Sequence, residues 1–273
     1  MMKKMLENVR NNSPLVHSIT NYVTVNDCAN ILLACGAAPI MADDEAEVEE
    51  ITSICNALYI NIGTLNKRTI PSMMLAGKKA NELNHPVILD PVGAGASSLR
   101  TNTCYELMEN IRFSVIRGNI SEIKTLAAGS GTTKGVDADL ADMITADTME
   151  STIEFAKAFS AKTGAIIIIT GATDIVADDK KAYILRNGRA EMGRITGTGC
   201  MLTAVVAAYI AANPDNPLEA CASAVASMGL SGELAFDRLE KGCGNSSYRN
   251  YIIDDIYNLT GEALEKGAVY EVR

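Results

Sequence analysis

Short apolar runs alternate with segments of helical period along most of the chain. Most runs end at or just before a glycine, a proline or a polar residue, and the run at 165–170 contains four consecutive isoleucines, as is typical of a central strand covered on both faces. This alternation predicts an α/β fold, in which a mostly parallel central sheet is flanked by helices. The predicted strands are 37–41, 57–62, 86–90, 113–118 and 165–170, and the predicted crossover helices are 43–55, 66–84, 98–111 and 146–163.

The pattern changes after the last of these strands. IVADDKKAYILRNG, residues 175–188, places two β runs on either side of Asp178 and Asp179, which predicts a hairpin that adds antiparallel strands at the edge of the sheet. Beyond it the helical period dominates, and the predicted helices are 200–212, 217–241 and about 248–266. A helical C-terminal third is not typical of a plain dinucleotide-binding domain.

Length and composition favour one domain over residues 1–273. A chain of 273 residues, of which 48% are apolar, can bury roughly three quarters of the surface that its unfolded form exposes. We find no linker rich in Pro, Gly or Ser, no low-complexity segment and no repeat of fixed period. A core of this size needs no disulfides.

Charge and cysteine usage exclude several functions. The net charge of −9 and the pI near 4.9 argue against nucleic acid or an anionic membrane as a partner, because both select for clustered Lys and Arg. No apolar stretch approaches the 18 or so residues of a membrane span, so we expect a cytoplasmic protein. Seven cysteines without a CxxC pair indicate reduced thiols, and two histidines exclude a metal centre built on three.

Candidate ligand-binding residues cluster at predicted strand ends. In open α/β sheets the ligand lies beyond the carboxyl ends of the strands, which here places Asp90, Arg117 and Thr170 at one edge. Asp90 closes a strand and precedes PVGAGAS, whose small residues predict an open strand end. Such an Asp can hold Mg²⁺, usually through water, although a turn Asp before proline is an equally good interpretation of this residue alone.

The segment RGNISEIKTLA carries a second set of polar residues. Asn119 and Glu122 are three residues apart at a predicted helix start, so they face the same way. They can form a capping box, which is a common stabilising device, or they can face a ligand. Arg117 favours the ligand, because the fixed donors of a guanidinium suit phosphate oxygens.

The stretch ITGTGCMLTAVVAAY sets a glycine turn against a long apolar helix. The amides of Gly197, Thr198, Gly199 and Cys200 would converge on one point at the helix start, where an anion is stabilised. That is what phosphoryl transfer requires. Neither GxGxxG nor GxxxxGK[ST] occurs here, which argues against a dinucleotide fold or a P-loop ATPase.

Cys200 itself has two interpretations. It can be a small structural thiol, as buried cysteines often are. Alternatively, the helix start favours the thiolate, which would then accept the proton of a substrate hydroxyl. A role as covalent nucleophile is less well supported, because no histidine is near it in the sequence.

Taken in order and spacing, several blocks resemble the hydroxyethylthiazole kinases of thiamine salvage. The resemblance runs from about Pro14 to Leu239. Membership of this ribokinase-like group implies an α/β kinase with a largely parallel sheet and an edge hairpin. The blocks are PLVHSITNYVTVNDCANILLACGAAPIMADDEAEVEEI, LYINIGTL, VILDPVGAGAS, VIRGNISEI, ITGATDIV and RITGTGCMLTAVVAAY.

The resemblance implies transfer of the ATP γ-phosphate to the hydroxyl of 4-methyl-5-(2-hydroxyethyl)thiazole, with Mg²⁺, in a homotrimer whose thiazole pockets lie between subunits. It assigns Met41, Asn21 and Gly197 to the thiazole alcohol. The remaining implied roles are ATP binding for Arg117 and Thr170, the anion hole for Gly199, Mg²⁺ and its waters for Asp90 and Glu122, and a base for Cys200.

Most ribokinase-like enzymes carry an Asp base where this chain has Cys200, and hydroxyethylthiazole kinases resemble this sequence in carrying Cys. Two alternatives share the fold. ATP-dependent dehydratases of hydrated nicotinamide cofactors carry Asp at this position and do not match the SITNY block. Kinases of the pyrimidine alcohol of the same pathway differ in pocket shape. A non-enzymatic nucleotide sensor would bind ATP without turnover, and binding alone needs no base.

Overall fold

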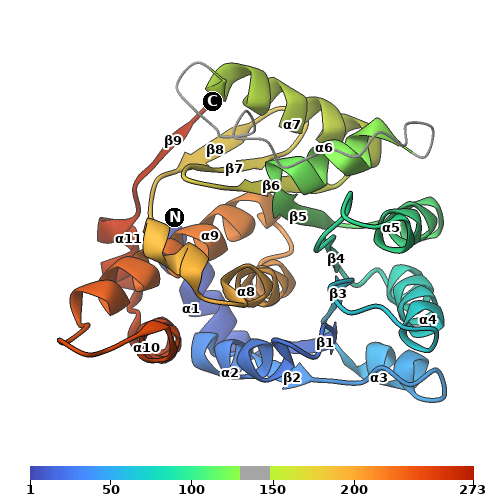
Figure 1. Cartoon of the computed structure of the whole chain (residues 1–273), viewed down its shortest axis with the longest axis horizontal. Helices are drawn as coiled ribbons and strands as arrows, with labels where there is room; N and C mark the ends of the chain where they lie inside the picture. The colour runs from blue at the N-terminus through green and yellow to red at the C-terminus, as the bar shows by residue number, and fades with distance from the viewer. Residues whose placement is uncertain (130–147) are drawn as a thin grey trace.

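The computed structural model describes residues 1–129 and 148–273, and these build one nine-stranded sheet of order β2-β1-β3-β4-β5-β6-β7-β8-β9. The strands from β2 through β6 are parallel, and β7, β8 and β9 continue the sheet in antiparallel pairing. The sheet therefore confirms the predicted parallel core and the predicted edge hairpin (Figure 1). The strands are β1 Leu15–Ile19, β2 Ala38–Ile40, β3 Ala57–Asn61, β4 Val87–Asp90, β5 Val115–Asn119, β6 Ile166–Thr170, β7 Asp174–Ala177, β8 Ala182–Leu185 and β9 Tyr270–Val272.

Helices cover both faces of the sheet. On one face α8 packs against β3 and β4, α9 packs against β7 and β8, and α1, α2, α10 and α11 surround this central pair. On the other face lie α3, α4, α5, α6 and α7 (Figure 1). The helices are α1 Met2–Asn12, α2 Val25–Cys35, α3 Val48–Ile54, α4 Thr69–Glu82, α5 Ser98–Asn110, α6 Ile120–Ala128, α7 Met149–Thr163, α8 Thr198–Ala212, α9 Pro217–Asp237, α10 Asn245–Asn258 and α11 Gly261–Gly267.

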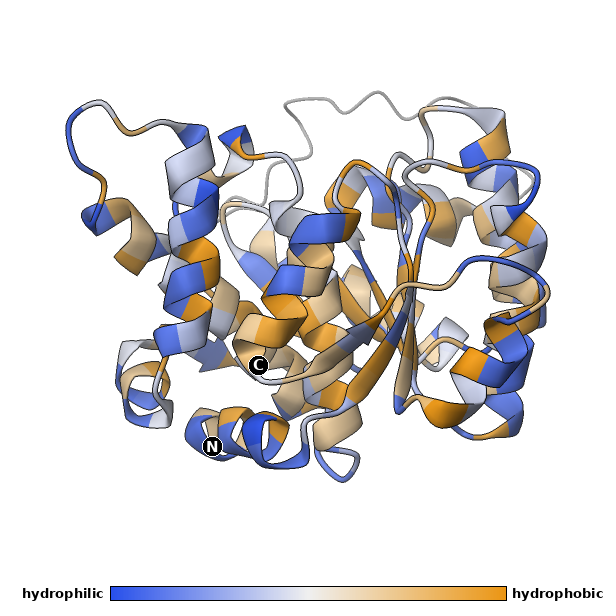
Figure 2. Cartoon of the chain, turned by 90° about the horizontal axis from the view of Figure 1, so that it is seen from below, coloured by the Kyte–Doolittle hydropathy of each residue, from blue (hydrophilic) through white to orange (hydrophobic). Residues whose placement is uncertain are grey.

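Two hydrophobic clusters form the core, one on each side of the sheet. The cluster around α8 and α9 is the reason for the long apolar stretch noted in the sequence, because α8 is buried on almost every side. The outer helices are amphipathic, with polar residues toward solvent, whereas the strands and central helices are largely apolar (Figure 2). The start of α8 is therefore held rigidly against the sheet.

Several element boundaries differ from the predictions. The predicted helix 43–55 shortens to α3, and the predicted helix 217–241 ends with α9 at Asp237. The predicted helix near 248–266 divides into α10 and α11, because Leu259 is extended and the Thr260 hydroxyl caps a new helix by accepting from the Ala263 amide. The pattern did not identify α1, β1, α2 or β9, and residues 146–147 of the predicted helix 146–163 lie outside the described residues.

Among the residues that the structure describes, no helix is both long enough and apolar enough to cross a membrane.

Candidate active site

The glycine turn lies at the N-terminus of α8, as the sequence predicts. Gly197 is the N-cap residue with φ 95°, a left-handed conformation that favours glycine, and a Cβ there would lie 2.7 Å from Thr24 Cγ2. The Met201 amide donates to Gly197 O at 2.8 Å. The amides ahead of it belong to the first turn, which has no intrahelical acceptors for them. Amides in this position are a suitable set of donors for an anion.

Asp90 lies at the carboxyl end of β4 and is completely buried. Its Oδ2 accepts hydrogen bonds from Thr203 Oγ1 at 2.9 Å, from Asn61 Nδ2 at 3.0 Å and from Tyr59 OH at 3.3 Å. The alternation along β3 explains two of these contacts: Tyr59 and Asn61 are two residues apart, and Asn61 lies opposite Asp90 in the parallel register. One carboxylate oxygen is thus held by three side chains.

The other oxygen of Asp90 has a different environment. Within the described residues Oδ1 is buried and has no hydrogen-bond partner, and the Arg117 Nη1 lies 3.8 Å away. Burial raises the pKa of Asp90 to about 6, the charge of Arg117 acts in the opposite direction, and the charge of Glu122 adds to the increase. Oδ1 thus has an ion pair with Arg117 but no hydrogen bond, and a buried carboxylate oxygen in this state is a suitable ligand for a further cation.

Cys200, in the first turn of α8, is only 8% exposed. Its Sγ accepts from Asn21 Nδ2 and from Asn61 Nδ2, both at 3.3 Å. In one of the two interpretations of Cys200 the helix start favours the thiolate. In the structure burial first and the charge of Asp90 second raise the pKa of Cys200, and the hydrogen bonds offset only part of this. The thiol is therefore protonated at neutral pH in the ligand-free site.

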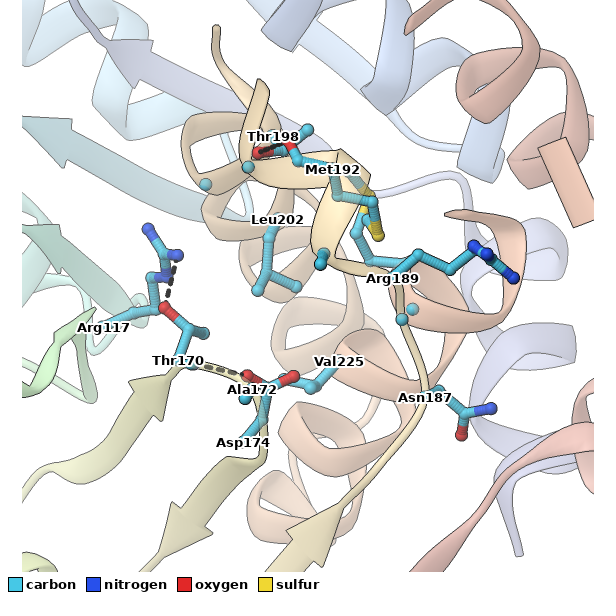
Figure 3. Close-up of a pocket in the computed structure, with 17 residues that line it drawn as sticks. Arg117, Thr170, Ala172, Asp174, Asn187, Arg189, Met192, Thr198, Leu202 and Val225 are labelled. Carbon is cyan, nitrogen blue, oxygen red and sulfur yellow. Dashed lines mark hydrogen bonds between the residues drawn. The ribbon is translucent and has the colours of Figure 1, made fainter. Parts of the chain in front are cut away.

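Arg117 connects the Asp90 site to a large cavity. It lies inside β5 rather than at its end, and its guanidinium donates to Thr170 Oγ1, at the end of β6, at 2.7 Å. It also packs against the glycine turn, since a Cβ on Gly199 would lie 2.5 Å from Arg117 Nη1. The cavity of about 510 Å³ starts at these residues and continues over the apolar side chains of Leu202 and Val225 (Figure 3).

Glu122 forms a capping box with Asn119, which is one of the two roles that the sequence predicts for this pair. Its Oε2 accepts from the Asn119 amide at 2.9 Å, while Asn119 Oδ1 accepts from the Glu122 amide at 2.8 Å. Its Oε1 accepts from the Gly93 amide at 2.8 Å, so the carboxylate also holds the loop after Asp90. The stabilising role is present, and the negative charge still acts on Asp90.

The loop after Asp90 is less open than its small residues predict. The Arg100 guanidinium lies against Gly93, where a Cβ would clash with it, and donates to Val92 O at 3.3 Å and to Gly63 O at 2.7 Å. It thereby ties the loop after β4 to the loop after β3. The small residues of this loop therefore make room for the Arg100 side chain, and not for a ligand as predicted.

Of the three predicted thiazole contacts, Gly197 is the N-cap of α8, and Asn21 and Met41 come from other elements. Asn21, only 4% exposed, donates to Asn61 Oδ1 at 3.0 Å and accepts from the Thr24 amide and hydroxyl, both at 3.1 Å. Met41 follows β2 and packs, half-buried, against the same hydrophobic cluster that contains Cys200. Met41 has no hydrogen bond to the buried polar network in the part of the chain that the structure describes.

Sequence reasoning missed three residues of this network: Tyr59, Asn61 and Thr203. The predicted strand 57–62 ran one residue past the observed end of β3, so Asn61 was counted as a strand interior. Tyr59 lies inside the predicted strand and is completely buried, but its hydroxyl donates to Asp90. Thr203 lies one turn after Gly199 on the apolar helix and donates to Asp90. Its polar side chain in an otherwise apolar stretch was the feature of the sequence that could have identified it.

The largely parallel sheet with its antiparallel edge and with helices on both faces defines an α/β protein of ribokinase-like fold. Solved structures share this fold at low identity: a pyridoxal kinase from Staphylococcus aureus, in complex with AMP-PCP and pyridoxal, aligns with a TM-score of 0.60 at 18% identity over 95% of this chain and 98% of that chain. The profile of the hydroxyethylthiazole kinase family matches residues 6–262. The chain belongs to this family.

Individual relatives agree with the profile. A hydroxyethylthiazole kinase from Clostridium acetobutylicum is 65% identical over 271 residues, which cover 99% of each chain. One from Clostridium tetani is 53% identical, covering 96% of this chain and 94% of its own. A solved structure of the hydroxyethylthiazole kinase protein from Pyrococcus horikoshii OT3 aligns with a TM-score of 0.88 at 33% identity, over 100% of this chain and 98% of that chain.

Proposed function

We propose that the protein transfers the γ-phosphate of ATP to the hydroxyl of 4-methyl-5-(2-hydroxyethyl)thiazole, within thiamine salvage. The observation that carries this proposal is the meeting of three groups at one point: the first-turn amides of α8, the Arg117 guanidinium and the buried Asp90. The amides and the guanidinium would stabilise negative charge that develops on the transferred phosphoryl group, and the Asp90 carboxylate would act through a bound cation. The relatives named for this activity support the choice of acceptor.

ATP fits the cavity beside Arg117. The apolar side chains of Leu202, Val225 and Met228 suit the base, and Arg117 and Thr170 lie at the end where the phosphates would reach the glycine turn. Gly199 allows Arg117 to lie directly against this turn. We therefore assign Arg117, Thr170 and Gly199 to the phosphates, in agreement with the sequence-based prediction.

The carboxylates of Asp90 and Glu122 also suit a bound Mg²⁺. Asp90 Oδ1 is buried without a hydrogen bond, and Mg²⁺ prefers one or two carboxylates together with phosphate oxygens and water. The described residues contain no cluster of three or more His, Cys, Asp or Glu side chains that could coordinate a metal ion without further ligands. Asp90 would hold the ion directly or through water, and Glu122, with both oxygens engaged by amides, would act through its charge.

When bound, Mg²⁺ neutralises the charge of the phosphate oxygens during transfer. The chain supplies the rest. The substrate hydroxyl would approach Cys200 Sγ between Asn21 and Gly197, with Met41 against the thiazole ring. Its proton would pass to the sulfur late in the transfer only when Cys200 is in its minor thiolate form, because a protonated thiol cannot accept it. Because the pKa of Cys200 is raised, positioning and charge stabilisation supply most of the rate, and the thiol contributes a smaller part.

We further propose a homotrimer of single-domain chains, each comprising residues 1–273, with the thiazole pockets between subunits. Tyr22 is 75% exposed and Val23 60% exposed, directly beside the buried Asn21 and Thr24. A second copy that covered these apolar side chains would close the mouth of the site. Analytical ultracentrifugation tests this arrangement, and a protein that remains monomeric while active would contradict it. We place the reaction in the cytoplasm, where ATP and reduced thiols occur.

The function is tested by incubating the purified chain with ATP, Mg²⁺ and one acceptor at a time: the thiazole alcohol, hydrated NADH, or the pyrimidine alcohol of the same pathway. We expect a phosphate ester on the hydroxyethyl oxygen, seen by ³¹P NMR and mass spectrometry, with the thiazole alcohol as the preferred acceptor. ATP-dependent dehydration of hydrated NADH, or preference for the pyrimidine, would contradict the assignment.

A further inference from the structure

Asn61 occupies the centre of the buried polar network. Its side chain is only 1% exposed and contacts the two groups on which the proposed reaction depends. The Nδ2 atom lies 3.0 Å from Asp90 Oδ2 and 3.3 Å from Cys200 Sγ, and it also lies 2.8 Å from Tyr59 OH. One amide group therefore connects the carboxylate that faces the phosphates to the sulfur that faces the acceptor.

The other end of the Asn61 side chain is fixed as well. Its Oδ1 accepts from Asn21 Nδ2 at 3.0 Å and from the Gly63 amide at 2.9 Å. These two donors determine the orientation of the amide, because the opposite orientation would place an NH₂ group against two donors. The Nδ2 hydrogens are thus directed at Asp90, Tyr59 and Cys200.

The number of hydrogens limits what Asn61 can do at one time. Nδ2 carries two hydrogens, and three acceptors lie within hydrogen-bond distance. Tyr59 OH can donate to Asp90 Oδ2 by itself, and Thr203 Oγ1 donates to the same oxygen at 2.9 Å. Asp90 therefore has other donors, whereas Cys200 Sγ receives side-chain amide hydrogens from Asn61 and Asn21.

We propose that Asn61 is a positioning residue of the phosphoryl transfer: it holds the Cys200 sulfur at the mouth of α8, at a fixed place relative to Asp90. This inference rests on the proposed function. A thiol on the first turn of a helix can otherwise rotate about χ1 to other staggered positions. Two amide donors directed at the sulfur, from the β3 end and from the β1–α2 turn, select one of them.

A double-mutant cycle tests the proposal through kcat. We would compare the wild type, Asn61→Ala, Cys200→Ala and the double variant, each with the thiazole alcohol, ATP and Mg²⁺. A hydrogen bond contributes about 1 kcal/mol, which corresponds to a factor of about 5. We expect Asn61→Ala to lower kcat at least fivefold more in the presence of Cys200 than in its absence, with the KM for ATP within twofold of the wild type.

Thr203→Val is the matched control. Thr203 donates to the same oxygen of Asp90 as Asn61 does. The hydrogen bonds of its hydroxyl within the described residues go to Asp90 Oδ2 and to Gly199 O, and not to Cys200. We expect the effects of Thr203→Val and Cys200→Ala on kcat to multiply. If Asn61→Ala and Cys200→Ala also multiply, Asn61 acts only through Asp90 and the proposal is wrong, even though an active wild type would still support the proposed function.

Two measurements keep the test decisive if Asn61→Ala folds poorly or if the wild type does not turn over. Asn21→Ala removes the other amide donor to the sulfur, and the same cycle with Cys200→Ala should show the same coupling. A crystal structure of Asn61→Ala or Asn21→Ala reports the sulfur position without turnover. We expect Sγ in a second rotamer or in two, and a sulfur that stays in place would overturn the proposal.

Discussion

Gly199→Ala separates the role of the glycine turn in ATP binding from its role in folding. A Cβ on Gly199 would lie 2.5 Å from Arg117 Nη1, 3.0 Å from Nη2 and 3.1 Å from Cζ. Carbon and nitrogen atoms do not approach this closely, so the guanidinium must leave its place against the turn. The atoms that must move are the end of a flexible side chain, and alanine is favourable in a helix, so the fold should tolerate the change.

The substitution should weaken the binding of the ATP phosphates. A displaced Arg117 loses a charge-assisted hydrogen bond to a phosphate oxygen, worth about 1.5–3 kcal/mol. That corresponds to roughly a 10- to 100-fold rise in the Kd for a non-hydrolysable ATP analogue and in the KM for ATP. The melting temperature should stay within a few degrees of that of the wild type.

Gly193→Ala is the control for this prediction. Gly193 lines the same cavity, but a Cβ there would meet no atom within 4 Å. Titration calorimetry with the analogue, together with steady-state kinetics, should therefore show wild-type affinity for Gly193→Ala and weakened affinity for Gly199→Ala. Equal affinity of the two variants would refute the assignment of Arg117 and the turn to the phosphates.

Changes at three further positions have defined outcomes. Cys200→Ala should lower kcat by about tenfold and Cys200→Asp should retain or raise it, since a carboxylate can accept the hydroxyl proton; an inactive Asp variant, measured by ADP release, would refute the base role. Because burial raises the pKa of Asp90 from 3.8 to about 6, the folded state holds this proton more tightly than the unfolded state, and stability falls as the pH rises from about 4 to 6. Asp90→Asn should therefore abolish turnover and raise the unfolding free energy at pH 7 by an amount on the order of 3 kcal/mol. The urea midpoint should still depend on pH between about 4 and 6, but less than in the wild type, because the pKa of Asp174 is also raised to about 6. A urea midpoint at pH 7 equal to that of the wild type would contradict this prediction. Asn119→Ala removes one half of the capping box and should lower the unfolding free energy by about 1 kcal/mol in urea titrations, and a loss of less than a few tenths would show that the cap is unimportant.

Much of the candidate site was predictable because it depends on the ends of parallel strands. Asp90 and Thr170 end β4 and β6, and the topology of parallel strands brings their carboxyl ends to one edge wherever they stand in the chain. The glycine turn before a long apolar stretch identified the start of α8. These features are local in sequence and have few structural alternatives.

The rest depends on contacts between distant residues. Asn61 reaches Cys200 across 139 positions of sequence, and a one-residue error in the end of β3 was enough to hide it. The raised pKa of Cys200 comes from burial and from Asp90, and neither is visible in the residues around the thiol. The division between α10 and α11 depends on Leu259 and Thr260, whose capping geometry competes with a continuous helical pattern.

A crystal structure of the protein with a non-hydrolysable ATP analogue, Mg²⁺ and the thiazole alcohol tests the central claim most directly. We predict the γ-phosphate against the amides of residues 198–200 and Arg117, with Mg²⁺ next to Asp90 and the acceptor hydroxyl next to Cys200 Sγ. A nucleotide bound with its phosphates away from the glycine turn, or an acceptor hydroxyl far from both Cys200 and the γ-phosphate, would contradict the account.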